Sequence, residues 1–527
     1  MTNNSKQASG QTQPNNQTAK KVAVVFKDKA EYPSNPPYHP QTSYPEYPFA
    51  NQQPTTNNQQ PNPAYASIRE SLHLLGLDIE NYNTPLWNPL KEFVSPGNTV
   101  IIKPNAVLDI NLKKEQSVFA SITHGSVLRA VTDYVYKALE GKGRLIIADA
   151  PLANSNFENW KKITGIPEIV DFYKKTGGFE IEVYDLRHLY SPFDHKHGFA
   201  PAGLKERTSR DPAGYREIDL GNKSLFSQWN QASCRRLYGA DYDRQATVRN
   251  HSDGHHRYKV AQTFLEADTV ISVPKLKVHS KVGVTLNIKS MVGTQGDKNY
   301  IPHCRIGDPK RGGDEYPDLG PLQNFINRYR MWTIEHLLSK EKPWIDLVYR
   351  ILFRPIQNKL QGLAHRLGRK KFGADYLGNI IGGAWYGNDT AWRMSLDLIK
   401  IILYGDRDGQ IQDRPQRKFF SIIDGIMAGE DEGPLAPTNK PAGVIIAGQS
   451  PLATDIVASS VMGFDFEKMP TFKVGLEQPW LANWPDGTKS LQISSNRPDW
   501  QSLEEIRANH LRFLPSRGWR RHLEIQK

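Results

Sequence analysis

The densest group of side chains able to do chemistry lies in residues 273–296, directly after a short apolar run. It comprises Lys275, Lys277, His279, Lys281 and Lys289. Lysines placed between a buried strand and a helix N-terminus favour anions, because free backbone N–H groups and the helix dipole both attract negative charge. We therefore interpret the segment as a pocket for phosphate or carboxylate, with His279 as an acid or base. The alternative is a basic loop on the surface.

Three further apolar runs end in polar residues that lie close to a proline or a glycine. They end at Lys103-Pro104-Asn105, Asp149-Ala150-Pro151 and Asp424-Gly425. Ligands of open α/β sheets bind beyond the carboxyl ends of the strands, so a parallel sheet would bring these ends together. We expect Asp149 or Asp424 to orient a histidine or a cation. The residues expected to bind an anionic substrate are Lys103, Asn105, Lys275, Lys277 and Thr285.

Two histidines outside the lysine-rich segment are further candidates. His124 precedes a helical pattern, and it is either a general acid or base or a loop residue whose neighbour Ser126 caps the helix. His303 is adjacent to Cys304, and both residue types ligate metals. Adjacent residues rarely ligate one ion well, so a divalent metal at His303 stands beside the alternative of a histidine with no ligand role.

The elements that would position these side chains alternate between apolar strands and helices. Predicted strands cover 22–26, 99–102, 144–148, 180–184, 269–273, 419–423 and 443–447. Predicted helices cover 127–139, 166–175 and 451–462, the last with Ser450 as N-cap and Pro451 at its first position. Apolar, β-branched runs are typical of strands buried on both faces. Their alternation with helices predicts an α/β fold with a mostly parallel sheet flanked by helices.

Composition divides the chain into parts. Residues 1–19 contain no Val, Ile, Leu or aromatic residue, which predicts a disordered tail. Helical spacing over 322–338 and 344–367 predicts a helical-hairpin insertion at 320–373. Its second helix is basic and resembles an amphipathic helix of membrane surfaces, although a hairpin with a solvated basic face gives the same pattern. The α/β domain then covers 20–319 and 374–475, followed by a C-terminal extension at 476–527.

Charge and cysteine content narrow the class of protein. The net charge of +12 favours acidic partners, which include nucleic acid, anionic lipid and phosphorylated small molecules. No nucleic-acid module and no interleaving of aromatic with basic residues is present, so we expect no nucleic acid. Two cysteines exclude a disulfide framework. Because no apolar run suits a signal peptide or a membrane span, we expect a cytoplasmic protein.

Several motifs, taken in order, resemble the domain of unknown function 362 family over roughly residues 20–470. They lie at Lys103–Asn105, Thr123–Gly125, Gly143–Pro151, Pro274–Gly293, Gly312–Pro317, Trp385–Thr390 and Asp424–Gly433. Some members of that family carry ferredoxin-type iron–sulfur segments. Two cysteines cannot hold such a cluster, so none is expected here.

The lysine-rich segment is also distantly similar to the lactate racemase family, which has a nickel-pincer cofactor. In that family a histidine acts as acid or base, a lysine ten residues later holds the cofactor, and a later histidine binds nickel. The resemblance places these roles on His279, Lys289 and His303. The ten-residue spacing matches, whereas Val284-Thr285-Leu286-Asn287 stands where that family has small residues.

These observations predict an enzyme acting on an anionic small molecule, such as a phosphorylated or nucleotide-linked sugar or a hydroxy acid. Its chemistry would be isomerase- or transferase-like. The predicted catalytic residues are His279, His124, Lys289, Asp149 and Asp424. The alternative is a non-catalytic scaffold that docks on an anionic membrane or an acidic partner through residues 344–371.

Overall fold

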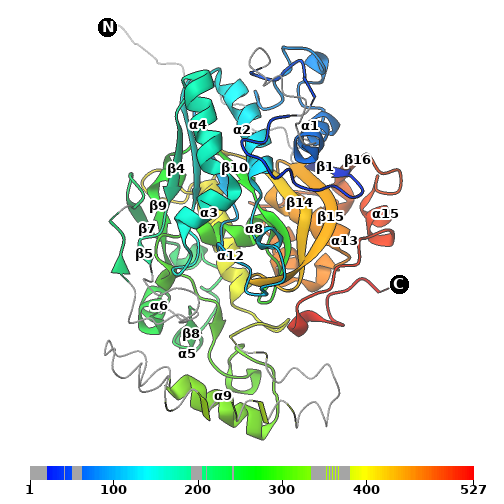
Figure 1. The fold of residues 1–527 in the computed structure, drawn as a ribbon. Coiled ribbons are helices and arrows are strands. Elements are labelled where there is room, and N and C mark those ends of the chain that lie inside the picture. The colour runs from blue at the N-terminus through cyan, green and yellow to red at the C-terminus, as the bar shows by residue number, and fades with distance from the viewer. Residues whose placement is uncertain are drawn as a thin grey trace, which may run out of the picture.

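The computed structural model describes residues 20–526 apart from 41, 50–61, 191–204, 209, 240–242, 381 and most of 334–379. Within that last stretch it describes residues 352, 355, 356, 359, 362, 363 and 366. The predicted tail at 1–19 and much of the predicted insertion lie outside the described residues. The remainder forms an α/β fold in which helices cover both faces of a mostly parallel sheet, as the sequence predicts (Figure 1).

The main sheet has the strand order β16-β1-β15-β14-β10-β2-β3-β4. Its strands are β1 (Lys21–Phe26), β2 (Thr99–Pro104), β3 (Arg144–Asp149), β4 (Ile181–Asp185), β10 (Thr269–Val273), β14 (Lys418–Glu432), β15 (Ala436–Gly448) and β16 (Gln492–Ser495). The strands from β14 to β4 in this order pair in parallel, and β15 is antiparallel to both β14 and β1. Parallel pairing brings the carboxyl ends of β2, β3 and β10 to the same edge.

The lysine-rich segment continues this sheet instead of forming a loop. After Pro274 the chain enters β11 (Lys275–His279), which pairs in parallel with the far part of β14. β12 (Gly283–Val284) then folds back antiparallel on β11 and leads into the short helix α8 (Leu286–Ser290). Every residue of β11 is buried. The alternative of a basic surface loop is therefore wrong, because Lys275, Lys277 and Lys289 are buried.

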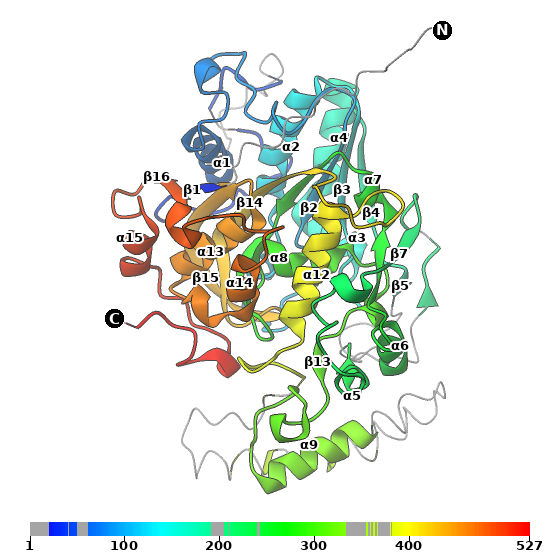
Figure 2. The same cartoon turned by 180° about the vertical axis from the view of Figure 1, so that it is seen from behind.

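Two hydrophobic cores lie on opposite faces of the sheet. Side chains of β2 alternate between them, with Val100 and Ile102 in one core and Ile101 in the other. The first face is covered by α1 (Pro63–Leu74), α2 (Gly125–Leu139) and α4 (Ile166–Gly177), as Figure 1 shows. The second face is covered by α12 (Ala391–Tyr404), α13 (Pro451–Met462) and α14 (Pro470–Leu476), which Figure 2 shows from behind.

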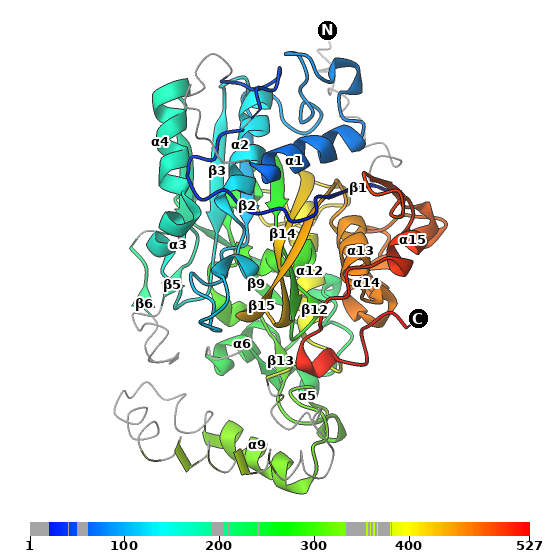
Figure 3. The same ribbon diagram turned by 45° about the vertical axis from the view of Figure 1, so that its right-hand side comes forward.

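The remaining described elements are further helices and three two-stranded sheets outside the main sheet. The helices are α3 (Phe157–Thr164), α5 (Gln231–Cys234), α6 (Arg244–Asn250), α7 (Gln262–Glu266), α9 (Pro321–Thr333) and α15 (Leu503–Ala508). Two-stranded sheets are formed by β5 (Leu189–Tyr190) with β6 (Lys205–Glu206), β7 (Tyr215–Asp219) with β9 (Arg257–Ala261), and β8 (Leu237–Tyr238) with β13 (Cys304–Arg305). Figure 3 shows α5, α6 and α9 below the main sheet. Within the described ranges, no helix has the length and apolarity needed to cross a bilayer.

Several predicted elements coincide with observed ones. The predicted strand 269–273 is β10, and the predicted helix 451–462 is α13, with Ser450 Oγ accepting a hydrogen bond from Ala453 N at 3.2 Å. Two expectations differ from the structure. The runs at 419–423 and 443–447 are parts of a long β14–β15 hairpin, and α2 is capped by His124 instead of Ser126. The C-terminal extension supplies β16, which pairs with β1 at the sheet edge.

Candidate functional site

The structure brings the four predicted strand ends together at one edge of the sheet. In the register of β10 and β2, Ser272 lies opposite Lys103. Lys275 lies opposite Asp424 between β11 and β14. Two salt bridges then join the strand ends in pairs, between Lys103 and Asp149 and between Lys275 and Asp424. The edge is therefore a polar layer at the carboxyl ends of the strands, where open α/β sheets bind ligands.

The pair Lys103–Asp149 is sealed within the protein. Lys103 Nζ lies 3.1 Å from Asp149 Oδ1, and the two residues are 1% and 3% exposed. Backbone N–H groups of Ala106 and Ala150 donate to the same carboxylate at 2.8 and 3.0 Å. A Cβ at Gly293 would stand 1.8 Å from Asp149 Oδ1, so only glycine lets the backbone pass here. Lys103 Nζ also donates to Pro104 O at 3.1 Å, so both of its described hydrogen bonds are made within the protein.

The pair Lys275–Asp424 is completed by a tyrosine that the sequence analysis missed. Lys275 Nζ donates to Asp424 Oδ2 at 2.9 Å and to Tyr32 Oη at 2.7 Å. Tyr32 Oη in turn donates to Asp424 Oδ1. Burial lowers the pKa of Lys275, and Asp424 opposes that shift. No sequence signal marks Tyr32, because it follows the first strand and lies far along the chain from its partners.

His124 has a structural part in this arrangement. Its backbone N–H donates to Asp424 Oδ2 at 3.0 Å, and its ring stacks on Tyr32 with 4.0 Å between ring centres. Its Nδ1 accepts a hydrogen bond from Ser126 N at 3.0 Å and so caps α2. Burial, followed by the charge of Lys275, lowers the pKa of the ring well below its usual value. The geometry therefore supports the capping role of His124 more directly than proton transfer.

A second group of lysines is buried without a carboxylate partner. Lys277 Nζ donates to the carbonyl oxygens of Ser121 at 2.6 Å and Pro434 at 3.3 Å. Lys298 Nζ donates only to carbonyl oxygens, the nearest at 2.8 Å. Lys289, 6% exposed, has no hydrogen-bond or salt-bridge partner among the described residues. We call Lys277, Lys289 and Lys298 the unpaired-lysine cluster. Sequence reasoning missed Lys298, which looks like a solvated turn residue.

Burial makes the ammonium form of this cluster costly. Desolvation, followed by repulsion from Lys281 and Lys298, lowers the pKa of Lys289 to about 7. Desolvation also lowers the pKa of Lys298 to about 7 and that of Lys277 well below its usual value. Such amines lose their protons near neutral pH unless an anion offsets the lost hydration.

Two histidines next to the cluster carry their protons on different ring nitrogens. His279 Nδ1 accepts a hydrogen bond from Lys281 N at 3.1 Å, so the neutral ring carries its proton on Nε2. His303 Nδ1 donates to Ile301 O at 3.0 Å, so its Nε2 keeps a lone pair. Burial, and after it the charge of Lys289, lowers both pKa values well below the usual range. His279, Lys289 and His303 thus lie within electrostatic reach of one another.

The residues around His303 do not fit a divalent metal. His303 offers one nitrogen, Nε2, and no group of three or more His, Cys, Asp or Glu side chains is arranged for a metal in the described part of the chain. Its charged neighbours are lysines, which repel a cation. We therefore derive no metal-dependent step.

The predicted use of the α8 N-terminus by a substrate anion is wrong. The backbone N–H groups of Asn287 and Ile288 each donate to the carboxylate of Asp455 at 2.9 Å. A carboxylate of the protein thus already occupies the helix end that was expected to take the ligand. Burial raises the pKa of Asp455 to about 7.

Two other predicted substrate contacts lie in closed surroundings. Thr285 Oγ1 is buried with no hydrogen-bond partner among the residues that the structure describes, and Thr285 directly precedes α8. Asn105 forms a turn in which its N–H donates to Thr123 Oγ1 at 2.9 Å and its Oδ1 accepts from Val107 N at 3.3 Å. Both residues are 5% exposed. The hydrogen bonds of Asn105 give it a role in holding the loop after β2, whereas no hydrogen bond of the described residues assigns a role to the Thr285 hydroxyl.

Comparison with known proteins bears on the lysine-rich half of the site. A family model described as domain of unknown function (DUF362) matches residues 221–460, which include β10, β11, α8 and the unpaired-lysine cluster. The match begins well after residue 20, so it leaves out Lys103 and Asp149. Neither the curated proteins nor the solved structures give a match, and the similarity to the lactate racemase family stays a prediction. The chain contains a domain of the DUF362 family at residues 221–460.

Proposed function

We propose that the chain is an enzyme that binds an anionic small molecule at the unpaired-lysine cluster and moves a proton on it. The substrate class is a phosphorylated compound, a nucleotide-linked sugar or a hydroxy acid. One observation carries the proposal: the lysines of this cluster are buried without a carboxylate to balance them in the described residues. We also place the protein in the cytoplasm, in keeping with a chain of only two cysteines.

Burial of a lysine without a counter-ion costs free energy, and a ligand that supplies the counter-ion recovers it. Lys103 and Lys275 already have carboxylate partners, so a ligand would gain little from them. Lys277, Lys289 and Lys298 have no carboxylate partner in the described part of the chain, so a ligand anion would gain most there. We therefore assign the paired lysines to holding the strand ends and the unpaired lysines to binding the substrate.

The same residues provide groups for proton transfer. Lys289, with a pKa of about 7, exists both as amine and as ammonium at neutral pH, which suits a general base. His279 has its proton on Nε2 and His303 has a lone pair on Nε2, so one ring donates and the other accepts. This set favours removal of a proton from one position of an anionic substrate and delivery to another, which is isomerase-like chemistry.

Binding is tested first, with sulfate and inorganic phosphate as probes of the purified full chain. We expect both anions to raise the melting temperature and the K277M and K289M variants to lose this response. Lys174→Met, at an exposed lysine of α4, is the matched control and should respond like the unaltered chain. The same response in all four proteins would refute the binding site.

Catalysis is tested with phosphorylated sugars, nucleotide-linked sugars and hydroxy acids incubated in D2O. We expect deuterium to enter one carbon of a substrate, detected by NMR, and H279Q and K289M to abolish the exchange. Anion-dependent stabilisation that needs Lys277 but comes without exchange on any substrate would refute the proton-transfer step and leave the binding site intact.

A further inference from the structure

The basic character of the chain is concentrated in the insertion at 320–373. This stretch contains 11 lysine and arginine residues against 3 aspartate and glutamate residues, which gives a net charge of +8. The whole chain has a net charge of +12. About a tenth of the residues therefore carries two thirds of the net charge, and none of the residues assigned above to anion binding lies in it.

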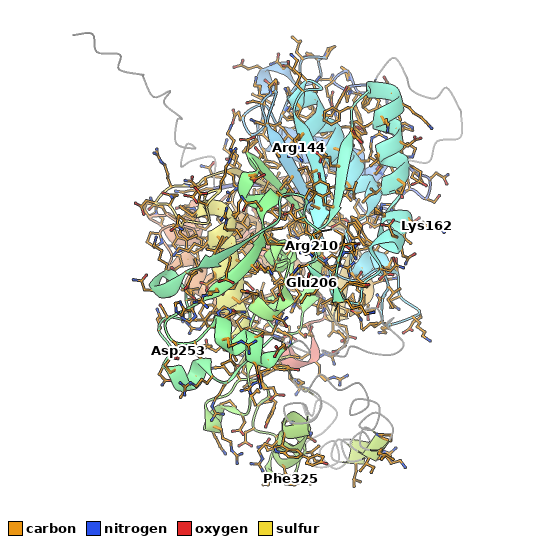
Figure 4. All side chains as sticks on the ribbon, turned by 90° about the vertical axis from the view of Figure 1, so that its left-hand side faces the viewer. Arg144, Lys162, Glu206, Arg210, Asp253 and Phe325 are labelled. Atoms are coloured by element: carbon orange, nitrogen blue, oxygen red, sulfur yellow. The ribbon has the colours of Figure 1, made fainter. Side chains whose placement is uncertain are left out.

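The helix α9, the first element of this insertion, has one buried and one exposed face. Gln323, Ile326 and Asn327 are buried at 3%, 6% and 0% exposure. The opposite face carries large apolar side chains that stay exposed: Leu322 at 54%, Phe325 at 59%, Tyr329 at 42% and Trp332 at 50%. Their spacing of three, four and three residues forms a single stripe along the helix. Figure 4 shows Phe325 at the lower end of the molecule, far from the sheet.

The described residues between 352 and 366 repeat this pattern with added charge. Leu352, Ile356 and Leu363 are helical and exposed at 58%, 59% and 55%. Lys359 and Arg366 are helical and exposed as well, and they follow Leu352 and Leu363 at helical spacing. Apolar and basic side chains are therefore exposed together among the described residues of this stretch.

We infer that the α9 stripe, together with the exposed residues Leu352, Ile356, Lys359, Leu363 and Arg366, docks on a lipid bilayer with anionic headgroups. Apolar side chains enter the interface of such a bilayer, basic side chains bind its phosphates, and tryptophan and tyrosine favour the boundary between them. A nucleic acid would leave Leu322, Ile356 and Leu363 in water. An apolar protein groove would give no role to the net charge of +8.

The contact is peripheral, since the described helices include none that could span a bilayer. It is independent of the proposed enzymatic function, because no residue of the unpaired-lysine cluster contributes to it. Binding should depend on both halves of the surface: the apolar stripe supplies hydrophobic burial, and the basic residues supply attraction that salt screens.

The full chain is tested by flotation with vesicles of phosphatidylcholine alone or mixed with phosphatidylserine. We expect flotation only with the anionic vesicles and a loss of flotation as NaCl is raised. The double variants F325S/W332S and K359E/R366E should each reduce the floated fraction several-fold. Their side chains are exposed, so the fold should tolerate both changes.

Matched controls use equally exposed residues elsewhere. Leu86→Ser removes a side chain that is 73% exposed, and K174E/K175E makes the same charge change on α4. Both should float like the unaltered chain. No flotation with anionic vesicles, or equal loss in the controls, would overturn the proposal. A dimer or larger oligomer in light scattering that F325S/W332S dissociates, without any vesicle binding, would identify a protein interface and would also overturn it.

Discussion

Lys275 and Lys277 stand two residues apart on β11, and both are 0% exposed. Lys275 has a carboxylate and a phenol as partners, whereas Lys277 donates only to two carbonyl oxygens. Equal burial therefore has different electrostatic consequences. The first lysine is balanced inside the protein. The second bears a desolvation cost that two carbonyl oxygens and the more distant charge of Asp149 offset only in part.

The same contrast separates two regions of the strand-end layer. At one side, Lys103–Asp149 and Lys275–Asp424 are neutral pairs that join neighbouring strand ends. At the other, the unpaired-lysine cluster adjoins His279 and His303, and no salt bridge joins its lysines to a carboxylate of the described residues. A protein gains stability from the first arrangement only if both partners are present. It keeps the second at a cost in stability, which is the usual mark of a binding site.

The largest effect on stability should come from removing one partner of a buried lysine–carboxylate pair. Lys275→Met removes the partner of Asp424 and leaves a buried carboxylate with only a tyrosine hydroxyl and backbone donors. We expect the free energy of unfolding in urea to fall by about 3–5 kcal/mol. A loss below about 1 kcal/mol would show that the pair contributes little and would remove the contrast with Lys277.

Lys277→Met is the counterpart on the unpaired side. It strands no carboxylate, and methionine fills much of the same volume, so the stability change should stay within about 1–2 kcal/mol of the unaltered chain. The stabilisation by sulfate should disappear at the same time. Destabilisation as large as that of Lys275→Met, with the sulfate response intact, would show that Lys277 is structural.

The fold could be predicted from local patterns. The short apolar runs ending in Lys103 and Asp149 are buried parallel strands, and the run before Asp424 is the first part of β14. The apolar residues and turn residues that mark a strand lie within a few positions of each other. The capping of α13 by Ser450 is equally local. These features depend on neighbours in sequence, so the sequence predicts them well.

The division between paired and unpaired lysines could not be predicted in this way. Asp424, the partner of Lys275, comes 149 residues later, and Tyr32 comes 243 residues earlier. Asp455 reaches the α8 N-terminus from α13 across a similar separation. No local pattern reveals which lysine a distant carboxylate will meet. Lys298 was overlooked for the same reason, since its burial is a property of the folded chain alone.

The contrast between paired and unpaired lysines predicts a pH dependence of anion binding. Lys289 and Lys298 have pKa values lowered to about 7, so they are charged below that pH and neutral above it. Sulfate keeps its charge over this range, so it should bind more tightly at about pH 6 than at about pH 8. Without ligand the sign is opposite: the unfolded chain binds more protons above pH 7, so stability contributed by these lysines should rise with pH.

Calorimetry in buffers of different ionisation enthalpy checks this directly, because sulfate binding near pH 7 should take up protons. The K289M variant should take up fewer, while the exposed-site control K174M should match the unaltered chain. Sulfate binding that is independent of pH would show that the lysines of the cluster stay charged. The proposed difference between the paired and the unpaired lysines would then be wrong.

The smallest effect should come from Thr285, which tests where the unpaired region ends. Its Oγ1 is buried and has no hydrogen-bond partner, so it bears a desolvation cost without a compensating bond. Thr285→Val keeps the shape and removes the hydroxyl, and we expect stability to rise by up to about 1 kcal/mol. Sulfate binding should stay unchanged, since this hydroxyl forms no hydrogen bond with a described lysine of the cluster. If Thr285→Val weakens sulfate binding as Lys289→Met does, the hydroxyl reaches the anion, and the ligand-binding region extends from the lysines to the start of α8.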